Sequence, residues 1–399
     1  MERTVMDKLR SWYDSMEEQI LFIVGAPFVG KSWLIEKLCR ENGEDYIKIS
    51  ADNLLEKELL KERLSEKKLL CEDVQRTGII IISDVNDKKT FERAKRIILR
   101  IRSEASVGYY RFIVESRLVG NESLLKHLEN ERYVRVIRVY PMNLKEFMDA
   151  IKIKGMPDIV DILRVYMYIG GLPECIACFL KTGSLTTVRE YQDKLLKVIT
   201  DSFGSKCGNI LKAIPHQLIK SEKTFTYKSF SRNAREREYG QCIDKLEGLG
   251  VICRINRLED TGFRLYLYDV GLLAAALCIS KASLIKEDEI FKVHRGVFVK
   301  CFIAEEYLGR YMRDMRIFYW NRTRAKAKLP FVIKDENDKL SVLQLCMGIS
   351  YDRSVQSFCE NHCVTKVYKI HIDAKKCHEI KANDKKLKLY DIAKVFSIK

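Results

Sequence analysis

Four residues near the start of the chain have the types and spacing that bind phosphate groups. Gly25, Gly30, Lys31 and Ser32 fit the pattern G-x-x-x-x-G-K-[ST] without a mismatch. Glycines at these positions let backbone N–H groups wrap an anion, and the following helix directs its first amides at the same anion. We expect Lys31 to reach the β- and γ-phosphates of a nucleotide and Ser32 to bind Mg²⁺.

The segment 25–33 is therefore the candidate nucleotide-binding loop. It consists of Gly25, Ala26, Pro27, Phe28, Val29, Gly30, Lys31, Ser32 and Trp33. The apolar run 21–24 before it predicts a short buried strand, and the segment 32–42 has apolar residues at helical spacing. A strand, a glycine-rich turn and a helix in this order are the context that the motif requires.

Hydrolysis of ATP at such a loop usually needs a second strand that ends in Asp and Glu, one for Mg²⁺ and one for the attacking water. The segment 77–87, TGIIIISDVND, supplies the strand, but its acidic pair reads Ser83–Asp84. Either Asp84 is the metal-side acid with no glutamate behind it, or Ser83 stands at the metal position and Asp84 at the water position. One carboxylate is missing in both alignments, so we expect binding to survive and hydrolysis to be weakened.

Two more polar residues are candidates for the catalytic site. The predicted strand 109–117 ends in polar residues, and Ser116 is either a sensor of the γ-phosphate or an ordinary loop serine. The alternating pattern of 131–140 predicts another strand, which Pro141 separates from a helix. Arg132 is either an arginine finger donated to a neighbouring subunit or a surface arginine.

Helical patterning dominates residues 145–220, and the segment 168–176 interrupts it with two glycines and a proline. Residues 206–275 predict a helix–turn–helix unit with a wing. Its second helix carries Arg235, Arg237 and Lys245, which could contact DNA. The alternative is a module that only contacts other proteins.

The segment after residue 285 mixes helix and strand and carries more than half of the excess positive charge. Four of its residues are possible metal ligands: Cys359, Cys363, Cys377 and His378. Their spacing matches no common zinc module, so we expect no zinc site there.

The bulk composition narrows the class of protein. The chain has 399 residues, enough for two to four domains, and a formal net charge of +16. This charge favours anionic partners such as nucleotide or nucleic acid, although a lysine-rich surface would also produce it. The sequence shows no signal peptide and no apolar run long enough to span a membrane, so we expect a cytoplasmic protein whose 13 cysteines are reduced.

These stretches, in this order, resemble the bacterial and archaeal AAA-type ATPases that carry a winged helix and a C-terminal nuclease-like domain of unknown function. The matching pieces are the loop at 25–32, IISDVN where the family reads Asp-Glu-Ile-Gln, then FIVES, VYPMNLKEF, YIGGLPE, DKLEGLGVI, LYLYDVGLL, RGVFVKCFIAEEYL and YWNRTRAKAKLPF. The resemblance implies an α/β fold that starts with an AAA-type parallel sheet. It also implies ATP with Mg²⁺ as the ligand. Members of this class often form rings, so an oligomer is possible, although the sequence itself shows no interface.

The resemblance further implies four domains: a P-loop ATPase core at 1–150, a helical lid at 151–205, a winged helix at 206–280 and a degenerate nuclease-like domain at 285–399. A nuclease of the restriction-endonuclease type needs carboxylates and a lysine to hold Mg²⁺ and activate water. The corresponding positions here are Lys300, Pro330, Gln344 and Cys346. All four have lost that chemistry, so we expect no DNA cleavage. The sequence predicts an ATP-binding protein with slow hydrolysis at most, or alternatively a non-catalytic scaffold for nucleic acid or protein.

Overall fold

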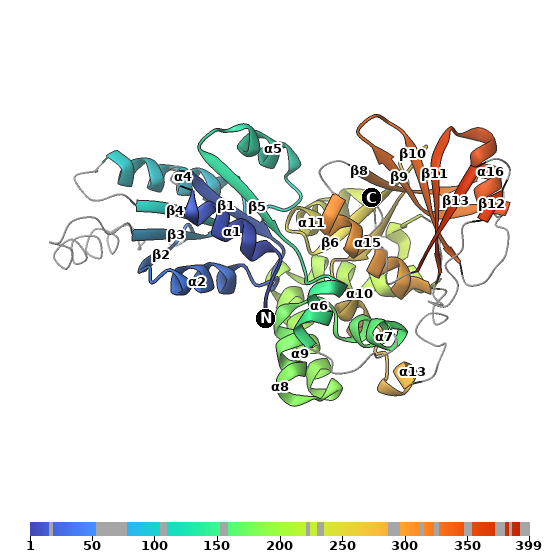
Figure 1. Cartoon of the computed structure of the whole chain (residues 1–399), viewed down its shortest axis with the longest axis horizontal. Coiled ribbons are helices and arrows are strands. Elements are labelled where there is room, and N and C mark those ends of the chain that lie inside the picture. The colour runs from blue at the N-terminus through green and yellow to red at the C-terminus, as the bar shows by residue number, and fades with distance from the viewer. Residues whose placement is uncertain are drawn as a thin grey trace. The chain divides into compact units, whose positions relative to one another are not determined.

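The computed structural model divides the chain into two compact units (Figure 1). The first unit consists of Met1–Tyr140 with Lys245–Val251, and the second of Pro141–Asp244 with Ile252–Lys399. The structure describes residues 1–15, 19–52, 78–103, 110–151, 159–220, 224–229, 235–285, 296–311, 315–322, 327–346, 353–371, 380–382 and 385–391. The four predicted domains are finer than this division and stay a prediction.

The first unit is built on a parallel sheet of five strands in the order β2-β3-β4-β1-β5. The strands are β1 Ile20–Gly25, β2 Tyr46–Ser50, β3 Gly78–Val85, β4 Tyr110–Ser116 and β5 Val134–Val139. The helices are α1 Val5–Asp14, α2 Lys31–Glu41, α4 Lys88–Ser103 and α5 Glu122–Asn130. This parallel sheet with its helices confirms the α/β prediction for this part of the chain.

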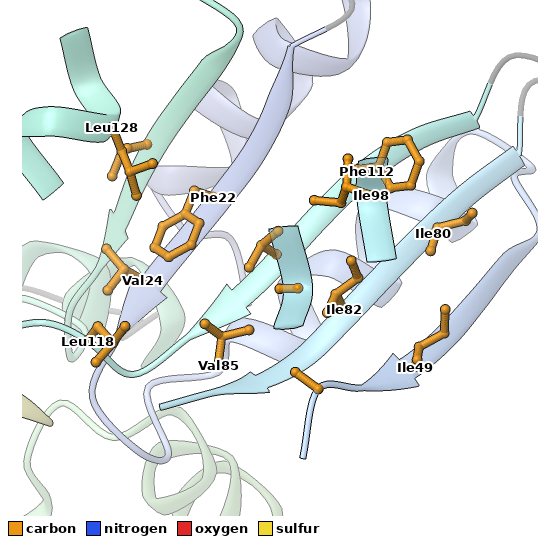
Figure 2. Packing of buried hydrophobic residues seen from close by; sticks show 14 of the residues in the cluster. Phe22, Val24, Ile49, Ile80, Ile82, Val85, Ile98, Phe112, Leu118 and Leu128 are labelled. Carbon is orange, nitrogen blue, oxygen red and sulfur yellow. The ribbon is translucent and has the colours of Figure 1, made fainter. Parts of the chain in front are cut away.

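Helices cover both faces of this sheet, which explains why its central strands are continuous apolar runs. Side chains from α4 and α5 pack with one face in a shared core (Figure 2). Ile80, Ile82 and Phe112 belong to that core, whereas Ile79 and Ile81 are buried on the opposite face. Because the five strands run parallel, their carboxyl ends all lie at one edge of the sheet, and the glycine-rich loop follows β1 at that edge.

The end of β3 contains one extra residue relative to β4. Ile82 pairs with Val114, but Val85 pairs with Ser116, so the register shifts between these two pairs. Asp84 takes a left-handed backbone conformation there, with φ of +61°. This bulge places Val85 in the same core as Ile82, although the two residues are three positions apart (Figure 2).

The second unit begins with helices, as the pattern of 145–220 predicts. They are α6 Leu144–Ile151, α7 Ile159–Ile169, α8 Pro173–Thr182, α9 Leu185–Phe203 and α10 Ser205–Lys220. Gly170 has φ of +80°, and its Cβ would lie 2.4 Å from a carboxylate oxygen of Asp269. Glycine is therefore required between α7 and α8, both for conformation and for space.

The remaining elements form helices and a second sheet. They are η1 Tyr227–Ser229, α11 Glu236–Gly248, β6 Ile252–Arg257, β7 Phe263–Leu267, α12 Val270–Ala276, α13 Lys281–Ile285, α15 Val297–Tyr311, β8 Met315–Asn321, β9 Lys328–Asp335, β10 Leu340–Cys346, α16 Arg353–Asn361, β11 Val364–His371, β12 Ile380–Ala382 and β13 Lys385–Asp391. The order in this sheet is β12-β13-β11-β10-β9-β8-β6-β7. The predicted wing, β6–β7, thus joins the C-terminal strands through the β6–β8 pair. The sheet crosses the expected border near residue 280.

Among the described residues, no single helix is long and apolar enough to cross a membrane. Only Asp161–Ile169 taken together with Pro173–Thr182 meets that criterion, as a pair bent by 116°. The cysteines that the structure describes form no disulfide bond. Cys377 and His378 lie outside the described residues.

Candidate nucleotide-binding site

The glycine-rich loop connects the end of β1 to the start of α2 and needs two unusual backbone positions. Gly30 has φ of +88° and Phe28 has φ of +63°, both in the left-handed region. Gly25 is required for space, because a Cβ there would lie 2.4 Å from the carbonyl oxygen of Val139. The end of β1 thus approaches the end of β5 closely, and the loop turns outward from this point.

Lys31 is buried within the loop, with 5% of its surface exposed. Its Nζ donates hydrogen bonds of 2.9 Å to the carbonyl oxygens of Gly25 and Ala26. Burial lowers the pKa of Lys31 to about 8, against the opposing attraction of Glu115. The ammonium group is therefore buried in the loop at a place where an added negative charge would stabilise its charged form.

Ser32, the predicted Mg²⁺ ligand, is partly exposed at the start of α2. Its Oγ donates a hydrogen bond of 2.7 Å to Oε1 of Glu115, the penultimate residue of β4. The other oxygen of this carboxylate, Oε2, lies 3.7 Å from the Nζ of Lys48 on β2. Sequence reasoning singled out the neighbouring Ser116 and missed Glu115, although both lie at the end of the same strand, β4.

Asp84, the acid predicted to serve the metal or the water, contacts β2. Its Oδ2 accepts hydrogen bonds of 2.8 Å from Ser50 Oγ and 3.0 Å from Ser83 Oγ. Because β2 and β4 flank β3 on opposite sides, these contacts lie away from β4 and β1. The structure does not bring Asp84 into hydrogen-bond contact with Ser32, and the bulge in β3 is the physical reason.

Ser116 and Arg132 do not lie open beside the loop. The Ser116 hydroxyl, in a residue with 1% exposure, donates to the carbonyl of Val85 at 2.7 Å and accepts from the Leu118 amide at 3.1 Å. These bonds fix the end of β4 to the end of β3. Arg132 is exposed and lies just before β5, at the edge of the parallel sheet opposite the loop. It is therefore too remote to serve the loop of its own chain.

A buried arginine that sequence reasoning did not single out holds the loop in place through hydrogen bonds to backbone carbonyls. Arg3 is 6% exposed, and its guanidinium donates to the carbonyl of Val29 at 3.2 Å and to that of Tyr140 at 2.8 Å. Val29 itself is fully buried, whereas Trp33 at the other end of the segment is 43% exposed, with the Nζ of Lys37 5.3 Å from its ring centroid. The loop is thus anchored at Val29 and accessible around Phe28, Gly30 and Ser32.

The second unit contains a buried acidic network that sequence reasoning also missed. Asp269 accepts hydrogen bonds from the amides of Gly171 at 2.7 Å and Leu272 at 2.8 Å. Glu305 accepts one from the amide of Val270 at 3.0 Å, and Tyr166 Oη lies 3.3 Å from the same carboxylate. Burial raises the pKa of Asp269 to about 6 and that of Glu305 well above its usual range. Since backbone amides satisfy both carboxylates, we interpret the network as structural.

The four residues that the family resemblance would align with a nuclease site lie on α15, β9 and β10. Lys300 lies on α15, Pro330 on β9, and Gln344 on β10, where it is 3% exposed; Cys346 ends β10. No group of three or more His, Cys, Asp or Glu side chains within the described ranges could hold a metal ion.

Comparisons with known proteins match parts of this chain. A family model described as a domain of unknown function (DUF8612) matches residues 160–283. A search of curated proteins found no match.

Three solved structures are similar in part. The RuvB Holliday junction branch migration motor of Thermotoga maritima is 12% identical, with 64% of this chain and 90% of that chain covered and a TM-score of 0.35. The Aeropyrum pernix Orc1 protein in complex with DNA is 11% identical, with 69% and 91% covered and a TM-score of 0.36. AMPPCP-bound DnaA from Aquifex aeolicus is 13% identical, with 61% and 86% covered and a TM-score of 0.31.

Proposed function

We propose that this chain binds ATP together with Mg²⁺ at the loop 25–33 and that it is an AAA-type protein with slow hydrolysis at most. One observation carries the proposal. A complete G-x-x-x-x-G-K-S sequence lies between a parallel strand and a helix, at the edge of the sheet where the strands have their carboxyl ends. Ligands of open α/β sheets bind outside that edge, and the start of α2 directs backbone amides at an anion there.

The residues present fit both parts of the ligand. Lys31 can exchange its two carbonyl contacts for phosphate oxygens, and the partly exposed hydroxyl of Ser32 can bind Mg²⁺. Mg²⁺ supplies charge neutralisation at the phosphates. Asp84 is proposed to order water or metal after leaving its contacts with Ser50 and Ser83.

The weakened acid pair argues for a protein in which ATP controls conformation more than it drives turnover. Ser116 would act as a sensor only if its hydroxyl left the Val85 carbonyl, and Arg132 would act as a finger only towards a neighbouring subunit. We propose that ATP occupancy sets the arrangement of the winged helix expected at 206–280 and of the inactive nuclease-like domain expected at 285–399.

The test compares the native chain with Lys31→Ala and with Lys8→Ala, which removes an exposed lysine of the same unit. We expect ATP with Mg²⁺ to raise the melting temperature of the native chain and of Lys8→Ala, and to leave Lys31→Ala unchanged. Phosphate release measured in parallel separates hydrolysis from binding. If ATP does not stabilise the native chain, or stabilises Lys31→Ala equally, the proposal is wrong.

A second candidate function, binding of nucleic acid without catalysis, is favoured by charge. The net charge is +16, and α4 exposes a row of basic side chains: Lys88, Lys89, Lys95, Arg96, Arg100 and Arg102. Phosphate contacts from such residues give affinity that falls steeply with salt. Double-stranded DNA binding measured from low to physiological salt, with and without ATP, tests this candidate. Absence of binding at low salt would eliminate it.

A further inference from the structure

The side chain of Glu115 is positioned by the sheet beside the residue expected to hold Mg²⁺. Glu115 lies on β4 opposite Ile23 of β1, two residues before the loop begins. Its Oε1 accepts the hydrogen bond of 2.7 Å from Ser32 Oγ, and its side chain keeps 14% of its surface exposed. The carboxylate is thus held at the first turn of α2 while part of it stays accessible to a ligand.

The acid that the motif would normally supply from β3 is displaced. Asp84 lies in the bulge and uses its Oδ2 for Ser50 and Ser83, on the side of β3 that faces β2. Glu115 comes from the strand between β3 and β1, which places it between the position of the missing acid and the loop. A carboxylate is therefore present at this edge, but on the next strand.

We propose that Glu115 completes the Mg²⁺ site with Ser32, in place of the acid that is missing from the Ser83–Asp84 pair. The inference rests on the proposed function, because Mg²⁺ would arrive with ATP. Two neighbouring oxygens around an octahedral Mg²⁺, each at about 2.0–2.1 Å from the ion, lie roughly 2.9 Å apart. The oxygens of Ser32 and Glu115 already have nearly that separation. If the hydroxyl rotates its proton away from the carboxylate, both oxygens could bind the ion without a rearrangement of the backbone.

A purely structural explanation must also be considered. Lys48 Nζ lies 3.7 Å from Glu115 Oε2, and Glu115 could serve only as a partner for Lys48 and Ser32. Lys48 is 42% exposed, so this pair contributes little to stability and leaves the carboxylate available. The two explanations differ in what happens to Mg²⁺ dependence when either partner is changed.

The experiment measures ATP affinity by calorimetry in Mg²⁺ and in EDTA, at equal ionic strength, for the native chain, Glu115→Gln, Asp84→Asn and Asp52→Asn. Asp52 is a carboxylate with 79% exposure just beyond β2, at the same edge of the sheet. We expect Glu115→Gln to lose at least about tenfold of the affinity gain that Mg²⁺ gives. In EDTA it should bind ATP as tightly as the native chain or more tightly, because a negative charge near the phosphates is gone. Asp52→Asn, the control, should keep the gain. Asp84→Asn separates the two roles left open for Asp84: it keeps the gain if Asp84 orders only water, as the inference requires, and loses it if Asp84 itself holds the metal.

Lys48→Gln supplies a second variant that leaves the proposed metal ligands intact. It should keep or increase the gain from Mg²⁺, since a competing cation is removed from Glu115. The inference is overturned if Glu115→Gln keeps the full gain, or if Asp84→Asn loses it. Failure of the proposed function looks different, because the native chain would then bind no ATP in either buffer. Melting temperatures without nucleotide report whether each variant is folded.

Discussion

The Nζ of Lys31 donates a hydrogen bond of 2.9 Å to the carbonyl of Gly25, the first residue of the phosphate-binding loop. The same ammonium contacts the carbonyl of Ala26, so the loop encloses its own lysine. Burial makes the charged form costly, and the pKa of Lys31 falls to about 8. An arriving phosphate would supply the opposite charge that this site lacks, which couples nucleotide binding to the protonation of one side chain.

ATP affinity should therefore decrease as pH rises above about 8. Bound phosphates favour the charged lysine, so the complex holds a proton that the free protein has released above this pKa. Binding must then take up a proton, so the association constant for ATP decreases by up to about tenfold for each pH unit above this pKa. Titration of a fluorescent ATP analogue between pH 7 and 9.5 measures this slope. A flat profile in the native chain would contradict the assignment of Lys31, and Lys31→Met should bind weakly at every pH.

Gly25→Ala should damage the loop through space and not through backbone conformation. The new methyl group would lie 2.4 Å from the Val139 carbonyl, so β1 and β5 would have to separate where the loop starts. We expect a loss of about 3 kcal/mol in the free energy of unfolding and loss of stabilisation by ATP. Urea titration and melting curves measure both quantities.

Gly43→Ala provides the control for Gly25→Ala. Gly43 has φ of +64°, but no atom lies within 4 Å of its Cβ position. Its cost should be only the backbone penalty of about 1 kcal/mol, and stabilisation by ATP should remain. Equal effects of the two substitutions would show that the contact between β1 and β5 has no special role.

Arg3→Met should destabilise the loop by removing its hydrogen bonds to two backbone carbonyls. The change leaves the carbonyls of Val29 and Tyr140 without their charged donor, at a site that is 6% exposed. The expected loss is about 3 kcal/mol in the free energy of unfolding, together with weaker ATP binding. Arg10→Met is the control, since its ion pairs lie at the surface and should leave the melting temperature nearly unchanged. If both variants have the same melting temperature, the hydrogen bonds of Arg3 do not stabilise the loop.

The sequence was sufficient to predict the first unit wherever a local pattern determined the structure. The apolar runs around 21–24 and 79–82 are strands, and the helix after the loop starts at Lys31 as the motif requires. The short strand β2, Tyr46–Ser50, was not predicted, because its alternation over five residues is weak.

The site residues were harder to predict because their positions depend on register and on residues distant in sequence. The bulge at Asp84 arises from the pairing of β3 with β4, which no pattern within β3 reveals. The contact between Ser32 and Glu115 joins residues 83 positions apart. Arg3 and Tyr140 are separated by 137 positions. A polar residue at the end of every predicted strand could have been treated as a site candidate, and that rule would have included Glu115.

The buried network of the second unit predicts a pH dependence of stability. The pKa of Asp269 is about 6 when folded and 3.8 in its ordinary state. Between these values the folded chain keeps a proton that the unfolded chain has released. The contribution to stability is therefore complete below about pH 4 and is lost as pH rises through 6, by up to about 3 kcal/mol. Glu305, Glu306 and Tyr166 face the same network, and the raised pKa of Glu305 acts in the same direction.

Asp269→Asn should remove that part of the pH dependence. The amide oxygen can still accept a hydrogen bond from one of the two amides of Gly171 and Leu272, so the variant should fold with reduced stability. The free energy of unfolding of the native chain should exceed that of the variant most at pH 4.5. This difference should shrink towards pH 7.5, where the native carboxylate is charged and buried. Urea titrations at several pH values measure the difference, and hydrogen exchange over Val270–Ala276 locates it in the second unit. A difference that stays constant with pH would mean that Asp269 is not protonated in the folded chain near pH 5.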